Sequence, residues 1–332
     1  MEQGLKLGII GFGRIVELVH LPIIKKLEQI THYGVYDMTP ERVELANRRS
    51  IAVYASIDEL LASDVDIVLI ATPPSSHYEL ARAALTAGKH VLIEKPVTVT
   101  FSEAEGLRRL AQQTGKAVSV FHNRRYDADF CFVKEAIAAG MVGNVLFVER
   151  RHHMFGSGAN FGVKSFDPQW RNKRQYGGGA LLDWGVHLID QLLQLNLGRM
   201  DSIHSSVQTL NWNQGEVDDY VHALMRLDNG ILYHMEINFA SNATVPFWVI
   251  GGDQGTLQVM NDKEAVLLAK GAQPRPFTLE QNKLTAAKEI YESFIQHIQG
   301  GGPLSVNMDE VTAVMEVIDR IHSGAPEYAS AT

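Results

Sequence analysis

Short strand-like segments, most of them apolar, alternate with helical segments through the first third of the chain. This alternation restricts the possible folds more than any other feature. The segments are residues 5–10, 32–36, 65–71, 91–93 and 117–121. Strands without a polar face are buried on both sides, as in a parallel sheet that is covered by helices. The pattern therefore predicts an α/β domain with a doubly wound parallel sheet.

The pattern changes after His122. A helical segment at 127–139 is followed by strand-like segments at 145–152, 203–210, 221–227, 231–239, 247–251, 256–260 and 265–268. Asp228-Asn229-Gly230 is a hairpin signal between two of them, and residues 286–323 have helical spacing again. We expect two domains. The first covers residues 1–122, and the second, 123–332, is an α+β domain with a large, mostly antiparallel open sheet and C-terminal helices.

Composition argues against several classes of protein. A chain of 332 residues is long for one hydrophobic core. A net charge of −8 without a run of Lys or Arg argues against a nucleic-acid surface. No apolar run approaches the roughly 20 residues that span a bilayer, and the N-terminus lacks the pattern of a signal peptide. Because Cys131 is the single cysteine, no intrachain disulfide can form, and we expect a cytoplasmic protein.

Two glycines follow the first strand in the pattern of a dinucleotide site. Gly11-x-Gly13 would make the turn and let backbone N–H groups approach a pyrophosphate, and Asp37 ends the second strand about 20 residues on. Val16 occupies the position of the third glycine, so we expect a slightly displaced helix. Asp37 would accept hydrogen bonds from ribose hydroxyls and repel a 2′-phosphate. This favours NAD, while Arg42 keeps NADP open.

The segment from Gly88 to Pro96 runs from a buried strand into a charged pair, Glu94 and Lys95. Ligands of open α/β sheets bind where such strands end. Partial burial disfavours the ammonium form of a lysine, which suits it to chemistry at such an edge, and Pro96 stiffens the turn. The alternative is a surface turn with a solvated ion pair.

A second group of candidate residues follows the three glycines at 177–179. The next helix is apolar nearly all round, which predicts burial, yet it carries Asp183 and His187 four residues apart on one face. Burying both is costly unless they are paired or used. They could be an internal hydrogen-bonded pair, two metal ligands or an acid–base couple. We predict no metal site, because the best third ligands, His152 and His153, are adjacent on a strand and point to opposite faces.

Five motifs together resemble the glucose–fructose oxidoreductase, inositol dehydrogenase and rhizopine-catabolism (Gfo/Idh/MocA) family. They are Gly-Phe-Gly-Arg-Ile at 11–15, Ala-Thr-Pro-Pro at 71–74 with His77, Glu-Lys-Pro at 94–96, Asn-Arg-Arg-Tyr at 123–126, and Asp183-x-x-x-His187. The resemblance implies a Rossmann domain that binds NAD(P) and a C-terminal domain whose open sheet often serves oligomerisation, so we expect a homodimer or homotetramer. It implies cofactor contacts at Gly11, Phe12, Gly13, Arg14, Ile15, Asp37, Thr72, Pro73, His77, Glu94, Lys95 and Asn123. It also implies catalytic roles for Lys95, Asp183 and His187.

The residues and the resemblance lead to one mechanistic hypothesis. A secondary alcohol on a sugar or cyclitol transfers its carbinol hydride to the nicotinamide, and His187 accepts the hydroxyl proton. Lys95 stabilises the developing alkoxide charge. Asp183 bonds substrate hydroxyls or orients His187. The alternative assignment makes Lys95 the general base.

Four further residues are candidate contacts to a small polyol or sugar substrate: Tyr126, His153, Trp170 and Arg171. Trp170-Arg171 and the segment 217–220 are loosely similar to the branch that contains scyllo-inositol dehydrogenases. Two other functions on the same fold stay open. One is a nucleotide-binding sensor without turnover, and the other is an NAD-dependent glycosidase. A pure sensor would need neither Lys95 nor His187.

Overall fold

The computed structural model describes residues 4–156, 164–210, 216–280 and 284–324 of the 332-residue chain. The chain divides into two compact units. The first consists of Met1–His122, Gly158–Gly178 and Leu284–Met315, and the second of Asn123–Ser157, Gly179–Lys283 and Glu316–Thr332. Two segments that follow residue 122 thus cluster with the first unit, whereas the sequence predicts a single division at that point. Where domains that fold separately begin and end stays a prediction.

The first unit contains a six-stranded parallel sheet with the strand order β3-β2-β1-β4-β5-β6. Its strands are β1 Leu5–Ile10, β2 Ile30–Tyr36, β3 Ala52–Val53, β4 Ile67–Ile70, β5 His90–Ile93 and β6 Val118–Val120. All four residues of β4 are buried, as expected for a central strand covered on both faces. The strand order reverses between β1 and β4, and ligands of such sheets bind at the carboxyl ends of the strands at this point. The predicted doubly wound parallel sheet is confirmed.

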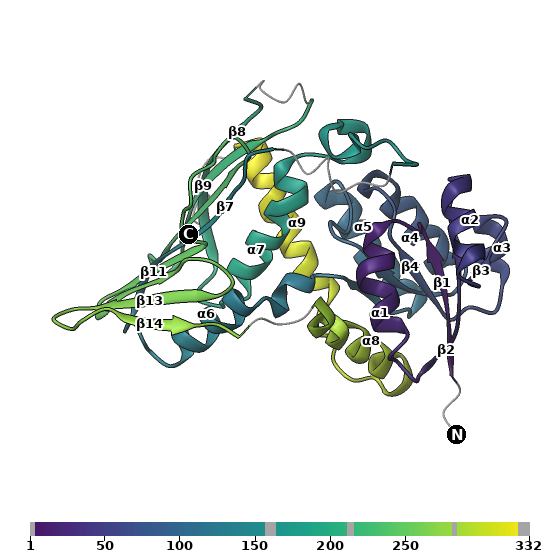
Figure 1. The fold of residues 1–332 in the computed structure, drawn as a ribbon, viewed down its shortest axis with the longest axis horizontal. Helices are drawn as coiled ribbons and strands as arrows, with labels where there is room; N and C mark the ends of the chain where they lie inside the picture. Colours follow the sequence, from purple (N-terminus) through teal and green to yellow (C-terminus); the bar gives the residue numbers. More distant parts are fainter. Residues whose placement is uncertain (1–3, 157–163, 211–215, 281–283, 325–332) are drawn as a thin grey trace. The chain divides into compact units, whose positions relative to one another are not determined.

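Helices connect these strands (Figure 1). They include a π-helix η1 Val16–His20 that continues as α1 Leu21–Ile24, and then α2 Pro40–Arg48, α3 Ile57–Ala62, α4 His77–Thr86 and α5 Phe101–Thr114. Helix α5 begins at Phe101. Thr100 is its N-cap, and the Thr100 hydroxyl and Glu103 carboxylate form the capping box.

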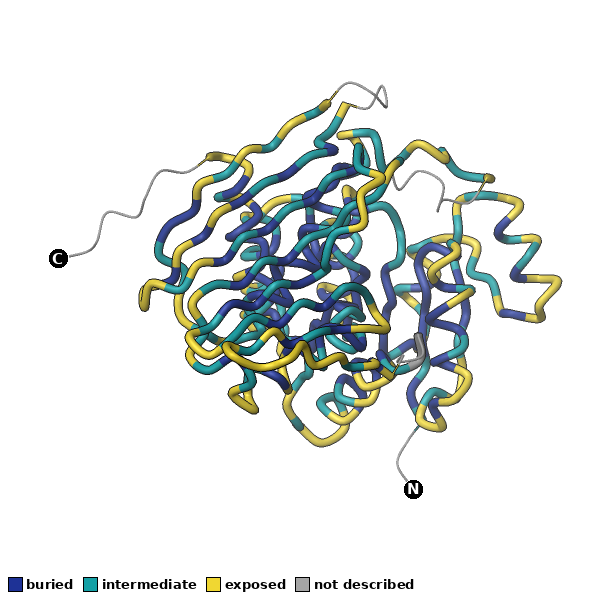
Figure 2. The backbone as a smooth tube through the Cα atoms, turned by 60° about the vertical axis from the view of Figure 1, so that its left-hand side comes forward, coloured by how far each residue is buried: buried dark blue, intermediate teal, exposed yellow. Residues whose placement is uncertain are grey.

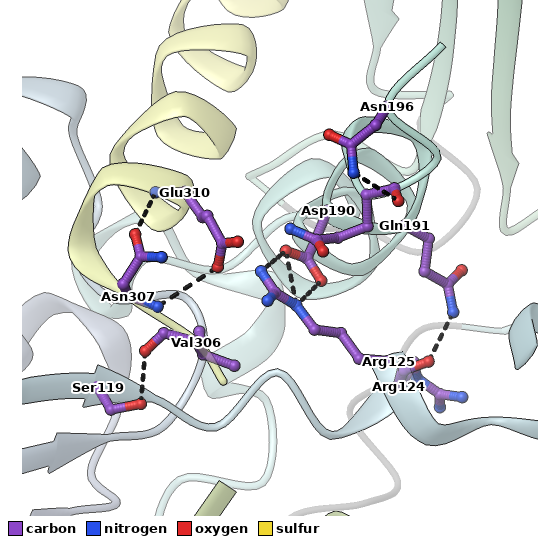
Figure 3. Close-up of polar contacts among 10 residues, drawn as sticks. Ser119, Arg124, Arg125, Asp190, Gln191, Asn196, Val306, Asn307 and Glu310 are labelled. Carbon is purple, nitrogen blue, oxygen red and sulfur yellow. Dashed lines mark hydrogen bonds and ion pairs between the residues drawn. The ribbon is translucent and has the colours of Figure 1, made fainter. Parts of the chain in front are cut away.

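The C-terminal segment is held against the first unit by specific contacts. Helix α8 Lys288–Gly300 buries Ile290, Tyr291 and Phe294. The Ser119 hydroxyl of β6 donates to the carbonyl of Val306 at 2.8 Å, directly before α9 Met308–Ser323 begins (Figure 3). These contacts explain why residues 284–315 cluster with the sheet of the first unit.

The second unit is built on an eight-stranded sheet with the order β14-β13-β12-β11-β7-β10-β9-β8. Its strands are β7 Val145–His153, β8 Met200–Gln208, β9 Tyr220–Leu227, β10 Leu232–Asn238, β11 Trp248–Gly252, β12 Gly255–Val259, β13 Glu264–Ala269 and β14 Arg275–Thr278. The predicted mostly antiparallel sheet is confirmed, and only β7 and β10 pair in parallel. The sequence did not predict β14, an edge strand that contains Pro276.

One face of this sheet is buried and the other is half exposed. In β9 and β10, buried residues alternate with residues that keep contact with solvent (Figure 2). Helix α6 Ala128–Ala138 contacts the buried face, since its Phe130 stacks on Trp248. Helix α7 Val186–Leu193 packs against β7 and β10. Among the described residues, no helix is long and apolar enough to cross a membrane.

Candidate active site

The loop after β1 is shaped by two glycines with different local requirements. Gly11 has a φ of +92°, and a Cβ atom there would lie 2.6 Å from the carbonyl oxygen of Ala71, after β4. A side chain at Gly11 would therefore clash with backbone. A Cβ atom at Gly13, in contrast, would meet no atom within 4 Å. The backbone around Gly13 is thus open to a ligand at the point where the strand order reverses, which fits a dinucleotide pyrophosphate.

Asp37 follows β2 and braces this loop. One carboxylate oxygen accepts the backbone N–H of Phe12 at 2.6 Å, and the other accepts both the N–H and the hydroxyl of Thr39, at 2.8 and 2.7 Å. A carboxylate offers about four lone-pair positions, so Asp37 keeps capacity for one further donor such as a ribose hydroxyl.

Arg42 is engaged within the protein. Its Nε donates to the carbonyl of Phe12, its guanidinium pairs with Glu17, and it lies 4.9 Å from the centroid of the Phe12 ring. The predicted cofactor contacts on either side of Gly13 differ in their exposure to solvent. Phe12 is buried and supports the loop, whereas Arg14 and Ile15 are exposed.

His77 joins the loop after β4 to the turn after β5. Its Nδ1 lies 2.7 Å from the carbonyl oxygen of Pro96, and its Nε2 lies 2.9 Å from that of Thr72. Burial lowers the pKa of His77 despite these two carbonyls, which favour the charged form, and a neutral imidazole donates to only one of them. The side chain has no exposed surface. Its effect on a bound cofactor would therefore act through the segments that it joins, including Thr72 and Pro73.

Glu94 and Lys95 follow β5, and Glu94 is turned inward. One of its oxygens lies 2.8 Å from Nε2 of His20, and the other accepts the backbone N–H of Lys95 at 3.1 Å. Burial alone would raise the pKa of Glu94, but the hydrogen bond and charge of His20 and the charge of Lys95 outweigh it and hold the pKa below its usual value. The alternative of a solvated surface pair is therefore wrong for Glu94, while Lys95 is half-buried.

In the second unit, Asp183 and His187 lie on one continuous helical segment. Asp183 belongs to a π-helix, η7 Leu181–Gly185, and the buried His187 to α7, which follows directly. The start of η7 is fixed by Asp218, whose carboxylate accepts the backbone N–H of Leu181 at 2.7 Å. Gly179 is required beside it, because a Cβ atom there would lie 2.3 Å from a carboxylate oxygen of Asp218.

A buried ion pair clamps the 3-10 helix η3 Asn123–Tyr126 to α7 (Figure 3). The Arg125 guanidinium donates to both oxygens of Asp190, with closest contacts of 2.6 and 2.9 Å. The amide of Gln191 donates to the carbonyl of Arg124 at 2.8 Å. The structure thus brings the segment with Asn123 and Tyr126 together with the helix that carries His187.

The neighbours His152 and His153 point to opposite faces of the sheet. His152 stacks on the indole of Trp184, with ring centroids 3.4 Å apart, and burial together with the charges of Arg150 and Arg124 lowers its pKa to about 3. His153 instead lies 3.3 Å from Glu236. The structure therefore places His152, and not the predicted His153, beside the segment of Asp183 and His187.

The remaining predicted substrate contacts, Trp170 and Arg171, belong to the first unit. They lie on the 3-10 helix η5 Trp170–Asn172, with the Arg171 guanidinium 4.2 Å from the centroid of the Trp170 ring. Among the described residues, no three His, Cys, Asp or Glu side chains are grouped to hold a metal ion.

Sequence reasoning missed His20 and Tyr291. His20 contacts Glu94 from η1, and the hydroxyl of Tyr291 lies 2.7 Å from Nδ1 of His20. The two residues are 271 positions apart. No local signal marks either residue, apart from the buried face of α8 that carries Tyr291.

Two family models match the chain. The oxidoreductase family with an NAD-binding Rossmann fold (GFO_IDH_MocA) matches residues 5–122, and the GFO/IDH/MocA C-terminal domain matches residues 130–258. The nucleotide-binding geometry of the first unit therefore agrees with a family defined by NAD binding.

Individual proteins agree with these matches. The uncharacterized oxidoreductase YdgJ of Escherichia coli K12 is 32% identical over 68% of this chain, and the match spans 62% of its own length, less than two thirds. The scyllo-inositol 2-dehydrogenase (NADP(+)) IolW of Bacillus subtilis is 30% identical over 81% of this chain and 73% of its own. A crystal structure of an NAD-binding protein from Listeria innocua superposes with a TM-score of 0.83 at 32% identity, covering 97% of this chain and 94% of the other.

The two glycines after β1 provide a matched test of the nucleotide site. Gly11→Ala should lower the free energy of unfolding by about 2–4 kcal/mol, because it adds a strained positive φ and a backbone clash. Gly13→Ala should change stability by less than about 0.5 kcal/mol but weaken NAD binding at least about 10-fold, because the methyl group would occupy the open backbone. Denaturant unfolding and calorimetric titration measure the two effects. Unchanged NAD affinity in Gly13→Ala would contradict the assignment.

Proposed function

This chain belongs to the GFO/IDH/MocA oxidoreductase family, and we propose that it is an NAD(P)-dependent dehydrogenase acting on a secondary alcohol of a sugar or cyclitol. The observation that carries the proposal is the turn after β5. There Lys95 stands at the carboxyl edge of a nucleotide-binding sheet, with its backbone amide held by a buried carboxylate. Catalytic side chains must be held close to their productive geometry, and this contact holds the backbone of the lysine.

The residues have separate roles in the proposed reaction. A bound nicotinamide supplies the acceptor for the hydrogen and two electrons that leave the carbinol carbon. His187 accepts the hydroxyl proton, because imidazole can exchange protons near neutral pH. Lys95 stabilises the negative charge that develops on the oxygen. Asp183 bonds substrate hydroxyls or orients His187. In the alternative assignment, Lys95 accepts the proton, and the substitutions described below distinguish the two assignments.

The surroundings of Asp183 support a polyol as the substrate. Trp184 follows Asp183 in the sequence, and its indole is stacked with the neutral imidazole of His152 and the guanidinium of Arg124. Aromatic faces pack on the C–H groups of a sugar-like ring, and polar groups at their edges bond its hydroxyls. The relative IolW is an inositol dehydrogenase, which agrees with this class. His153 is left out of the proposed substrate contacts because its side chain lies on the other face of the sheet.

The cofactor preference follows from Asp37 and Arg42. Asp37 places a carboxylate after β2, where it would repel a 2′-phosphate. Arg42 is buried and already bonds the carbonyl of Phe12 and the carboxylate of Glu17, so it does not offer a cation to that phosphate. We therefore propose NAD in preference to NADP.

The half-exposed face of the eight-stranded sheet supports self-association. Leu224, Leu232 and Leu268 are each about 40% exposed on this face, among polar neighbours such as Arg151 and Glu236. Apolar surface that is rimmed by polar residues fits an interface between copies of the chain. We propose a homodimer or homotetramer formed through this face.

The first test of the activity is the appearance of reduced-nicotinamide absorbance. Inositols, aldoses and their acids are supplied in turn with excess NAD and then with NADP. We expect at least one polyol to be oxidised, with kcat/KM at least about 10-fold higher with NAD. Release of free sugar from an aryl glycoside without net NADH would instead identify a glycosidase. NAD binding without any turnover would identify a sensor.

Substitutions test the proposed roles. Lys95→Ala and His187→Ala should each lower kcat at least about 100-fold, while the Kd for NAD changes less than about 3-fold. Lys116→Ala and the exposed His204→Ala are matched controls that should retain full activity. A loss of only a few-fold in both active-site variants would contradict the mechanism. To identify the base, we would add small amines or imidazole to each variant, expecting imidazole to restore His187→Ala.

The self-association is tested by light scattering on the eluting protein. Leu224→Asp combined with Leu268→Asp should convert the oligomer to a monomer, because the charges would be buried without partners. Leu146→Asp is the control. Leu146 is 54% exposed in β7, but alternation along the strand places its side chain on the opposite face of the sheet from Leu224 and Leu268. A monomeric wild-type protein would rule out the proposed oligomer.

A further inference from the structure

A buried chain of three polar side chains ends at the turn that carries Lys95. The Tyr291 hydroxyl of α8 lies 2.7 Å from Nδ1 of His20, and Nε2 of His20 lies 2.8 Å from a carboxylate oxygen of Glu94. The other oxygen of Glu94 accepts the N–H of Lys95 at 3.1 Å. All three side chains come from elements of the first unit, namely α8, η1 and the end of β5.

The ionisation of Glu94 fixes the direction of its hydrogen bond with His20. Burial raises the pKa of the Tyr291 phenol well above its usual value, so the phenol keeps its proton. The pKa of Glu94 lies below its usual value despite burial, so Glu94 is a carboxylate and accepts. Nε2 of His20 therefore donates to Glu94, while Nδ1 of His20 and the Tyr291 hydroxyl share the other hydrogen bond.

The three side chains are buried. His20 has no exposed surface, Tyr291 is 2% exposed and Glu94 is 8% exposed. The ring centroid of Phe121 lies 4.4 Å from the ring centroid of His20 and 6.0 Å from that of Tyr291. Removing an acid, an imidazole and a phenol from water is costly unless each is fully hydrogen-bonded. A leucine cluster would stabilise the core at lower cost, so the polar chain calls for a further role.

We propose that His20 and Tyr291 are positioning residues for Lys95, an inference that rests on the proposed dehydrogenase function. His20 fixes the rotamer of Glu94, and Glu94 holds the amide of Lys95. On the far side of Lys95, the carbonyl of Pro96 is held by His77. The backbone is thus tied on both sides of the lysine, as the placement of an ammonium group against a developing charge requires.

The hydrogen bonds among Tyr291, His20 and Glu94 also set the charge of Glu94. The titratable groups that face it are His20 from η1, Tyr291 from α8, His77 from α4 and its neighbour Lys95. Without the donor at His20, the burial of Glu94 becomes decisive and its pKa rises. Glu94 then takes up a proton as the pH falls and becomes a weaker acceptor for the N–H of Lys95. Activity that needs the carboxylate is therefore lost on the acidic side.

The test compares kcat over about pH 5 to 9 in four variants. His20→Leu removes the donor and should lower kcat at least about 30-fold, with its acid limb moved at least about one pH unit upward. His20→Gln keeps an N–H near the position of Nε2 and should recover most of both losses. Tyr291→Phe should lower kcat about 3- to 10-fold with KM changed less than about 2-fold. Tyr233→Phe removes another buried hydroxyl, one bonded to the backbone of Leu197, and should leave kcat unchanged.

Infrared spectroscopy makes the outcome independent of turnover. His20→Leu should show a protonated-carboxyl band near neutral pH that is absent from the wild type and from the double variant with Glu94→Gln. If no polyol is oxidised but this band is present, the proposed function fails and the control of Glu94 by His20 stands. If polyols are oxidised but the band is absent and the acid limb is unmoved in His20→Leu, the inference is overturned. Should His20→Leu fail to fold, equal kcat values in Tyr291→Phe and Tyr233→Phe would overturn it.

Discussion

The parallel pairing of β1 with β4 is the constraint on which the first unit depends. The strand order reverses at this pair, and ligands of open α/β sheets bind at the carboxyl ends of the strands at such a point. The pairing is so close that the turn after β1 tolerates only glycine at position 11, where a side chain would meet the carbonyl of Ala71. Asp37 and Lys95 follow β2 and β5, the neighbours of this pair, so all these groups reach the same edge of the sheet. The nucleotide site is thus a consequence of topology before it is a consequence of any single side chain.

Features that depend on one strand and its end could be predicted from the sequence. The apolar run of β5 identified the turn with Glu94 and Lys95, and the glycines after β1 identified the loop that Asp37 braces. Features that depend on which segments meet could not. Glu94 reads as a solvated partner of Lys95 until a histidine from η1 and a tyrosine from α8, 271 residues later, enclose it. The clustering of α8 with the first unit has the same origin, since its apolar face does not specify the surface that it covers.

The two histidines at the end of β7 show a second limit of prediction. Strand geometry predicted that His152 and His153 point in opposite directions, which is the arrangement that the structure shows. Which of them faces the candidate catalytic helix depends on which side of the sheet α7 covers. That side is decided by the packing of α7 on β7 and β10 and by the stacking of Trp184 on His152. Alternation along a strand therefore predicts that neighbouring side chains lie on opposite faces of the sheet. Which of the two faces is buried depends on the packing of other elements against the sheet.

Each unit contains a π-helical turn next to residues of the proposed mechanism, η1 with His20 in the first unit and η7 with Asp183 in the second. A π-turn holds one residue more than an α-turn and is less stable, so it persists mainly where a function requires it. In η1 the wide turn lets Val16 be fully buried while His20, at its other end, reaches Glu94. The sequence predicted a displaced helix because valine replaces the third glycine, and the structure shows a wider turn in its place. In η7 the same device carries Asp183 and passes directly into α7 with His187. In each unit, a π-helix thus carries an ionisable side chain to which the proposed mechanism gives a role.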